Sequence, residues 1–81
     1  MFGKELKNAR EAAGLSQEKL AFEAEIDRSY VSLLENDRKS PTLDTLVRIA
    51  DAIGIPASEL ISRVEKSRRP KAAAKGSKQR R

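Results

Sequence analysis

The sequence predicts an all-α protein, a compact five-helix bundle over residues 1–65 followed by a disordered basic tail over residues 66–81. Three observations predict this. Apolar residues recur at intervals of three and four, and no segment alternates like a half-buried strand. Residues that cap or break helices stand between the apolar stripes. From Lys66 onward stripes and caps are both missing, and the chain carries eight basic residues and no acid.

The first two helices are short and separated by a glycine turn. The first carries one apolar stripe, which Gly14 can end. Its members are Phe2, Leu6, Ala9 and Ala13. Ser16 caps the second helix, where Glu18 in the first turn suits the helix dipole. The buried stripe of this second helix consists of Leu20, Ala21 and Ala24.

The third helix is predicted to cross the second helix closely. Asp27 caps it, and Val31 and Leu34 face inward. A turn of about three residues joins the two helices, which can cross at a steep angle only if a small side chain lies between them. Ala21 fills that place, and Ile26 helps to seal the angle. The sequence therefore predicts a helix-turn-helix.

A polar loop and two further helices complete the predicted bundle. Residues 36–41 are polar and close on a proline, as loops do. Thr42 caps the fourth helix and Gly54 ends it, with a stripe of Leu43, Leu46, Val47, Ala50 and Ile53. Pro56 suits the first turn of the fifth helix. Its apolar face consists of Ala57, Leu60, Ile61 and Val64.

Over residues 3–62 the chain resembles the repressor–Cro, or Xre-type, helix-turn-helix domain. The resemblance rests on four segments in order, "LKNAREAAGLSQEKLA", "DRSYVSLLEN", "RKSPT" and "LVRIADAIGI". It implies a lambda-repressor-like five-helix fold whose third helix lies in the DNA major groove. It also implies a sequence-specific regulator of transcription that binds double-stranded DNA, as a repressor, an activator or both. The segment "DRSYVSLLE" is similar in particular to restriction–modification controller proteins.

The outward face of the third helix supplies the candidate base-reading residues, Arg28, Ser29, Ser32 and Leu33. The Arg28 guanidinium can donate two hydrogen bonds to guanine, or it can pair with Glu23 or Glu25 at the surface. Leu33 can pack on a thymine methyl group, or it can extend the core. Each of the two serines can contact a base or a phosphate, or its hydroxyl can simply be solvated.

The resemblance also implies a second set of residues that contact phosphates. Helix N-termini and loops beside a recognition helix commonly bind the DNA backbone. The candidates are Ser16, Gln17, Tyr30, Asn36, Arg38 and Lys39. Phe22 is expected to lie over the third helix near Tyr30 or Leu33. The resemblance further implies a structural ion pair between Arg10 and Glu35, and it places Glu25 where related proteins carry a turn glycine.

Composition narrows the function. The chain has no cysteine and no histidine, so we expect no metal site, no cofactor and no enzymatic activity. No apolar run approaches the roughly 20 residues that span a bilayer, which favours a cytoplasmic protein. The chain has 17 basic and 12 acidic residues, and with eight basic residues in the tail, residues 1–65 carry a net charge of −3. That charge speaks against non-specific DNA binding by the folded part.

The remaining expectations concern partners. One recognition helix reads only a few base pairs, and the resemblance implies a homodimer on an inverted-repeat operator. We expect no small-molecule effector, because the sequence shows no large second domain. The predicted dimer interface consists of Ile49, Ile55, Leu60, Ile61 and Val64. Two alternatives stay open at this point. The bundle could be a protein-interaction module such as an antitoxin, or the basic tail could bind nucleic acid without sequence preference.

Overall fold

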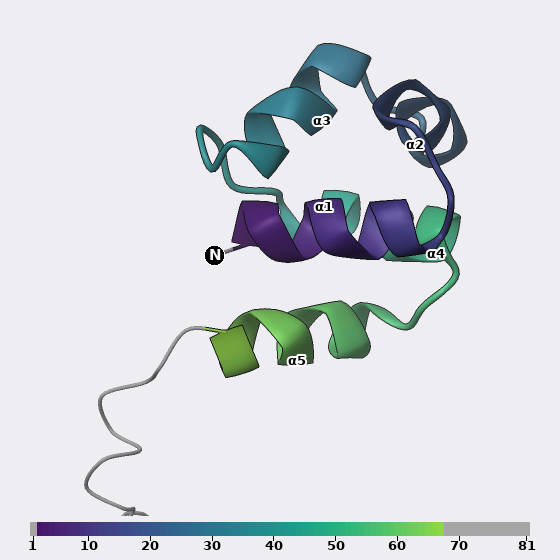
Figure 1. Cartoon of the computed structure of the whole chain (residues 1–81). Helices are drawn as coiled ribbons and strands as arrows, with labels where there is room; N and C mark the ends of the chain where they lie inside the picture. The colour runs from purple at the N-terminus through teal and green to yellow at the C-terminus, as the bar shows by residue number, and fades with distance from the viewer. Residues whose placement is uncertain (1, 68–81) are drawn as a thin grey trace, which may run out of the picture.

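The computed structural model describes residues 2–67, and within that range it contains helices and no strand. The helices are α1 (Phe2–Ala12), α2 (Gln17–Ala24), α3 (Arg28–Glu35), α4 (Leu43–Ile53) and α5 (Ala57–Ser67). α1 packs between α3 and α5, while α4 lies behind α1 and contacts α2 and α5 (Figure 1). The predicted all-α five-helix bundle is confirmed. The helix α5 runs two residues past the boundary predicted at 65, and the predicted tail from residue 68 onward lies outside the described residues.

Side-chain and glycine caps set the helix ends that position the functional surface. The Ser16 hydroxyl accepts a hydrogen bond from the Lys19 N–H at 3.0 Å, which opens α2. The Thr42 hydroxyl does the same for the Thr45 N–H at 3.1 Å, which opens α4. Gly54 ends α4 with a φ of 96°, a conformation that costs glycine little. These three ends lie where the sequence predicts them.

One apolar core joins all five helices. Its buried members are Leu6, Ala9, Leu20, Ala21, Ala24, Val31, Leu34, Leu46, Ile49 and Leu60. The small side chain of Ala21 is buried, and α2 and α3 are in contact, as the predicted helix-turn-helix crossing requires. Each large aliphatic side chain in this core contributes about 1.5–3 kcal/mol through burial. The core therefore holds the helix-turn-helix against α1 and α4.

The predicted inward face of α4 is partly wrong. Leu43 is 73% exposed and Val47 is 41% exposed, whereas Thr45 and Ile49 are buried. α4 is apolar around more than half of its circumference, and its contacts with α2 and α5 decide which side turns inward. The buried side is the one that carries Ile49, so Leu43 and Val47 remain on the surface.

The predicted dimer interface is also partly wrong. Ile49 and Leu60 are fully buried in the monomer core, so neither side chain can contact a second copy. Ile55 is half-buried and packs against the core. Ile61 is 40% exposed and Val64 is half-buried, so both remain candidates for an interface.

The end of α3 is fastened to the start of α1 by Asp37. The Gly3 N–H donates a hydrogen bond to Asp37 Oδ1 at 2.9 Å, which satisfies a backbone donor in the first turn of α1. Asp37 itself has a φ of 57° and follows the helix end, where its N–H bonds to the Leu34 carbonyl at 3.1 Å. The loop that leaves α3 is therefore held against α1.

Acid is expected to weaken this connection in a defined direction. The hydrogen bond from Gly3 holds the pKa of the Asp37 carboxyl below its usual value of 3.8. Because the folded pKa is lower than the unfolded one, the contact stabilises the fold above pH 3.8 and is lost as the pH falls through the lowered value. Carboxyl NMR titration should show the lowered pKa. The stability difference between the wild type and Asp37→Asn, measured by urea unfolding, should narrow over the same acid range.

Asp37→Asn is a suitable comparison because asparagine tolerates the left-handed conformation and keeps an acceptor oxygen without titrating. A pKa of 3.8 or higher for the Asp37 carboxyl in the wild type would contradict its hydrogen bond with the Gly3 N–H.

Candidate nucleic-acid interface

The outer face of α3 carries the four side chains predicted to read bases. Arg28 and Ser29 are exposed, and Ser32 and Leu33 are half-buried. The opposite face is fixed to the core by the fully buried Val31 and Leu34. In Figure 1, α3 lies at one edge of the bundle, and it packs mainly on α1 and α2. The helix can therefore present this face to a groove without rearrangement of the core.

The N-terminus of α3 is open to an acceptor from outside. Asp27 has the extended backbone of a capping residue, with φ −68° and ψ 142°, but its carboxylate makes no capping hydrogen bond. Its carbonyl accepts from the N–H groups of Tyr30 and Val31 at 3.0 and 3.2 Å. Asp27 is therefore the N-cap residue of α3, as predicted, but it caps the helix without a side-chain hydrogen bond. The first N–H groups of α3 keep their capacity to bind an anion.

A hollow beside α3 brings the start of α2 and Arg28 together. Its lining residues are Arg10, Ser16, Gln17, Glu18 and Arg28. The Ser16 oxygen is occupied as the cap of α2, but its O–H remains a donor. An anion in this hollow would be attracted by the positive end of the α2 dipole and by the Arg28 guanidinium, against the repulsion of the single Glu18 carboxylate. That combination suits a DNA phosphate.

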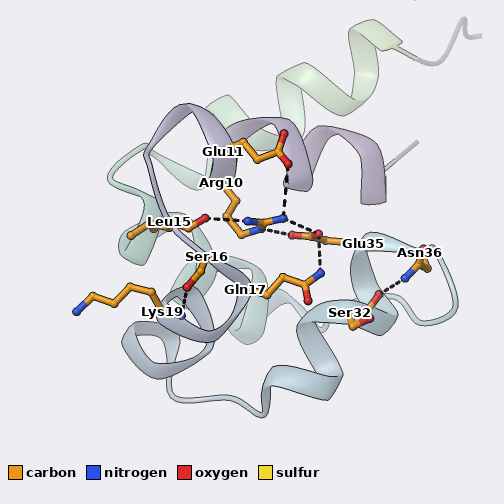
Figure 2. Close-up of polar contacts among 9 residues, drawn as sticks. All are labelled: Arg10, Glu11, Leu15, Ser16, Gln17, Lys19, Ser32, Glu35 and Asn36. Atoms are coloured by element: carbon orange, nitrogen blue, oxygen red, sulfur yellow. Dashed lines mark hydrogen bonds and ion pairs between the residues drawn. The ribbon is translucent and has the colours of Figure 1, made fainter.

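A buried polar network underlies the hollow (Figure 2). Arg10 Nε and Nη2 donate to the two oxygens of Glu35 at 2.6 and 3.1 Å, and Arg10 Nη1 donates to the Leu15 carbonyl at 2.8 Å. The Gln17 amide donates to Glu35 Oε1 at 3.0 Å. The Arg10 and Glu35 side chains are only 9% and 4% exposed, and the hydrogen bond to Glu35 raises the pKa of Arg10. The network ties α1, the start of α2 and the end of α3 together.

Two predicted phosphate ligands have partners within the protein. The Gln17 side chain bridges to Glu35, so the structure gives it a role that the sequence did not indicate. The Asn36 side chain donates to the Ser32 carbonyl at 2.8 Å and closes the end of α3 (Figure 2). Each amide retains a second N–H, so phosphate contact by either residue stays a prediction.

The other predicted phosphate ligands lie around the same helix. Tyr30 is half-buried against the core, which leaves its hydroxyl as the part that suits a phosphate. Arg38 and Lys39 are exposed in the loop after α3. With Arg28 they place positive charge near both ends of the helix.

The expected position of Phe22 is wrong. The side chain is 75% exposed on α2, and the Lys19 ammonium lies 5.8 Å from the ring centroid. Lys19 also pairs with Glu23 across one turn of the same helix. With three quarters of its surface exposed, the Phe22 side chain is not buried against α3.

Sequence patterns did not single out two residues that position the helix-turn-helix. Asp37 fastens the end of α3 to α1, as described above, and its only signal is a polar residue where a loop leaves a helix. Arg48 of α4 donates hydrogen bonds to the carbonyls of Ala24 and Glu25 at the turn between α2 and α3. Its spacing of four from Asp44 predicts only a surface ion pair.

Within residues 2–67, no group of three metal-ligating side chains is placed to hold a metal ion. No helix in this range is long and apolar enough to cross a membrane.

Comparison with known proteins supports the same assignment. Residues 6–60 match the family described as "Helix-turn-helix". The chain is 42% identical to control protein C.MunI from a Mycoplasma species over an alignment of 66 residues. This alignment covers 80% of this chain and 89% of that protein. The chain is also 34% identical to control protein C.BamHI from Bacillus amyloliquefaciens over 62 residues. That alignment covers 75% of this chain and 76% of that protein.

A solved structure shows the same fold. The restriction–modification controller protein C.AhdI from Aeromonas hydrophila superposes with a TM-score of 0.71 at 42% identity, over 73% of this chain and 89% of that one. The family match runs from α1 into α5 and so includes the whole helix-turn-helix. The chain therefore belongs to the helix-turn-helix family of the repressor–Cro (Xre) type, whose members are DNA-binding regulators of transcription and not enzymes.

Proposed function

We propose that two copies of this chain read an inverted-repeat DNA operator, each through its α3, and so control transcription in the manner of a restriction–modification controller protein. The observation that carries the proposal is the outer face of α3. It combines an exposed arginine with small hydroxyl side chains and one leucine, and no acidic side chain lies between Arg28 and Leu34. Such a face suits base edges and thymine methyl groups in a major groove.

The charge distribution favours a sequence-specific contact. Arg28, Arg38 and Lys39 are exposed at or beside α3, although residues 1–65 carry a net charge of −3. The exposed acids Asp27 and Asp37 stand at the same two ends of α3, so these cations can orient the protein on phosphates but add little net attraction. Discrimination then depends on the bases. A protein with this activity would work in the cytoplasm.

An apolar surface on α4 and α5 suits the second copy. Leu43 and Val47 are exposed on α4, and Ile61 is exposed on α5. Beside them lies a hollow lined by Phe2, Pro41, Leu46, Ile61, Val64 and Glu65. The helix α5 lies on the opposite side of α1 from α3 (Figure 1), so pairing through this surface would leave both copies of α3 free to contact DNA. A symmetric pair would place two reading helices on two half-sites.

Selection of duplexes from a randomised pool by the full chain, at about physiological salt, tests the proposal. Enrichment of an inverted repeat with a fixed half-site spacing is the expected result. Enrichment of single half-sites would contradict the dimer. A pool that stays unenriched while the chain still binds DNA would contradict sequence-specific reading by α3 and leave the non-specific alternative.

Arg28→Ala is expected to remove the preference at one base position in each half-site. The lost bidentate contact should lower discrimination at that position by about 1–3 kcal/mol. Competition binding with single-base variants of the enriched duplex measures this quantity. Arg63→Ala on α5 is the matched control, because it removes an arginine from a helix outside the reading surface and should leave every base preference unchanged. Uniform weakening across all duplexes would instead make Arg28 a phosphate ligand.

A further inference from the structure

Arg48 connects α4 to the turn of the helix-turn-helix. Its Nη1 group donates to the carbonyl oxygens of Ala24 and Glu25, each at 3.3 Å. Its Nε and Nη2 groups donate to Asp44 Oδ2 at 3.2 and 3.1 Å. One side of the guanidinium is therefore held by its own helix, and the other side reaches the last residue of α2 and the residue that follows it.

The turn has a specific need for these hydrogen bonds. Glu25 has a φ of 60°, a left-handed conformation that non-glycine residues adopt at a cost. The N–H groups of Glu25 and Ile26 already close the end of α2 by bonding to the Phe22 and Ala21 carbonyls at 3.2 and 2.9 Å. The carbonyls of Ala24 and Glu25 are the groups that Arg48 satisfies, and a cation is favoured there by the α2 dipole.

The same helix also carries the apolar surface proposed for the second copy. Leu43 and Val47 are exposed on α4 and directly precede Asp44 and Arg48 along the chain. The turn that Arg48 holds leads directly into α3. A shift of this turn would therefore move α3 relative to α4, and in a dimer it would change the distance between the two reading helices.

We infer that Arg48 is a positioning residue for DNA recognition, which fixes the turn before α3 and thereby the half-site spacing that the dimer reads. The inference rests on the proposed function, because half-site spacing has meaning only for a dimer on an inverted repeat. Arg48 need not touch DNA in this role. It acts through the two turn carbonyls and is itself oriented by Asp44.

The chain offers a closely matched control for this role. Arg63 on α5 pairs with Glu59 at the same spacing of four, with its Nη2 group 3.0 Å from Glu59 Oε2, and the two arginine side chains are similarly exposed at 41% and 36%. Within the described residues, Arg63 donates hydrogen bonds only to Glu59. Arg48→Met and Arg63→Met therefore remove equivalent ion pairs, but only Arg48→Met removes contacts with the turn.

Two measurements on the full chain test the inference. Amide hydrogen exchange, followed without DNA, should be at least about tenfold faster at Glu25 and Ile26 in Arg48→Met, because the substitution removes the charge-assisted hydrogen bonds to both turn carbonyls. Duplex selection should then return a broader distribution of half-site spacings, while the base preferences within each half-site stay the same. Arg48→Lys, which keeps a donor for the turn, should restore part of the spacing preference.

Asp44→Asn keeps Arg48 but weakens the ion pair that orients it. This second variant keeps the inference testable if Arg48→Met does not fold. The distribution of half-site spacings for Asp44→Asn should be intermediate in width between those of the wild type and Arg48→Met. Spacing distributions for Arg48→Met and Asp44→Asn that both equal that of Arg63→Met would overturn the inference, even if turn exchange is faster. Failure of the proposed function is distinguishable, because it would appear as a lack of any inverted repeat in the wild-type selection.

Discussion

Arg10→Met is expected to lower the free energy of unfolding by about 3–5 kcal/mol, because it leaves a buried carboxylate without its cation. Glu35 accepts hydrogen bonds from Arg10 Nε and Nη2, and its side chain is only 4% exposed. After the substitution only the Gln17 amide still donates to it. A domain of this size has a total stability of roughly 0.05–0.15 kcal/mol per residue, so the loss removes much of it. Urea unfolding followed by circular dichroism, at one fixed protein concentration, measures the difference.

Two controls separate burial from simple loss of charge. Arg63→Met breaks an exposed pair and should cost no more than about 1 kcal/mol. The double variant Arg10→Met with Glu35→Leu removes both buried charges and should recover much of the lost stability, since apolar replacement of a buried pair is often close to neutral. A loss below about 1 kcal/mol in Arg10→Met alone would mean that water reaches Glu35 and that the pair contributes as little as a surface pair.

The network also bears on DNA reading, because it lies directly behind the reading surface. Arg10 lines the hollow beside Arg28, and Gln17 stands at the N-terminus of α2. A variant that remains folded without the pair should bind the selected duplex more weakly, because the end of α3 would no longer be held to α1 and α2. Under the proposed function, stability and DNA reading would both depend on the same buried charges.

Local signals predicted the helix limits well because caps act over a few residues. Ser16, Thr42 and Gly54 each fix a helix end through hydrogen bonds or backbone conformation within one turn. The orientation of α4 is a different case, because Leu43 and Ile49 are both apolar and only contacts with α2 and α5 decide which of them is buried. A one-dimensional pattern does not contain that information.

In the candidate site, too, features set by local geometry were predictable, and contacts between distant segments were not. The outward face of α3 follows from helical geometry once Val31 and Leu34 are known to point inward. The partners of Asp37 and Arg48 depend on segments 34 and 23 or 24 residues away, so no local pattern indicates them. The Arg10–Glu35 pair joins residues 25 apart, and only resemblance to related proteins suggested it.

Gly3→Ala is expected to lower the free energy of unfolding by about 2 kcal/mol or more, because α1 crosses the end of α3 at this residue. An added methyl group would overlap the Glu35 carbonyl oxygen and lie 2.8 Å from the Leu34 carbonyl oxygen. Overpacking costs typically about 1–3 kcal/mol, and backbone atoms cannot rotate away as side chains can. Alanine recovers up to roughly 1 kcal/mol through its higher helix propensity, which does not offset a clash of this kind. Thermal and urea unfolding measure the net effect.

Gly14→Ala separates this steric effect from backbone strain. Gly14 has a φ of +76° and nothing within 4 Å of an added methyl group, so its substitution should cost about 1–2 kcal/mol from conformation alone. Gly3→Ala should in addition displace the backbone of Leu34 and Glu35 at the end of α3, which Gly14→Ala leaves in place. If α1 moves away from α3, the Gly3 N–H leaves Asp37, and the pKa of that carboxyl should rise toward its usual value of 3.8. A destabilised variant with an unchanged Asp37 titration would show that α1 yields elsewhere, and the close crossing at Gly3 would then not be what holds the end of the reading helix in place.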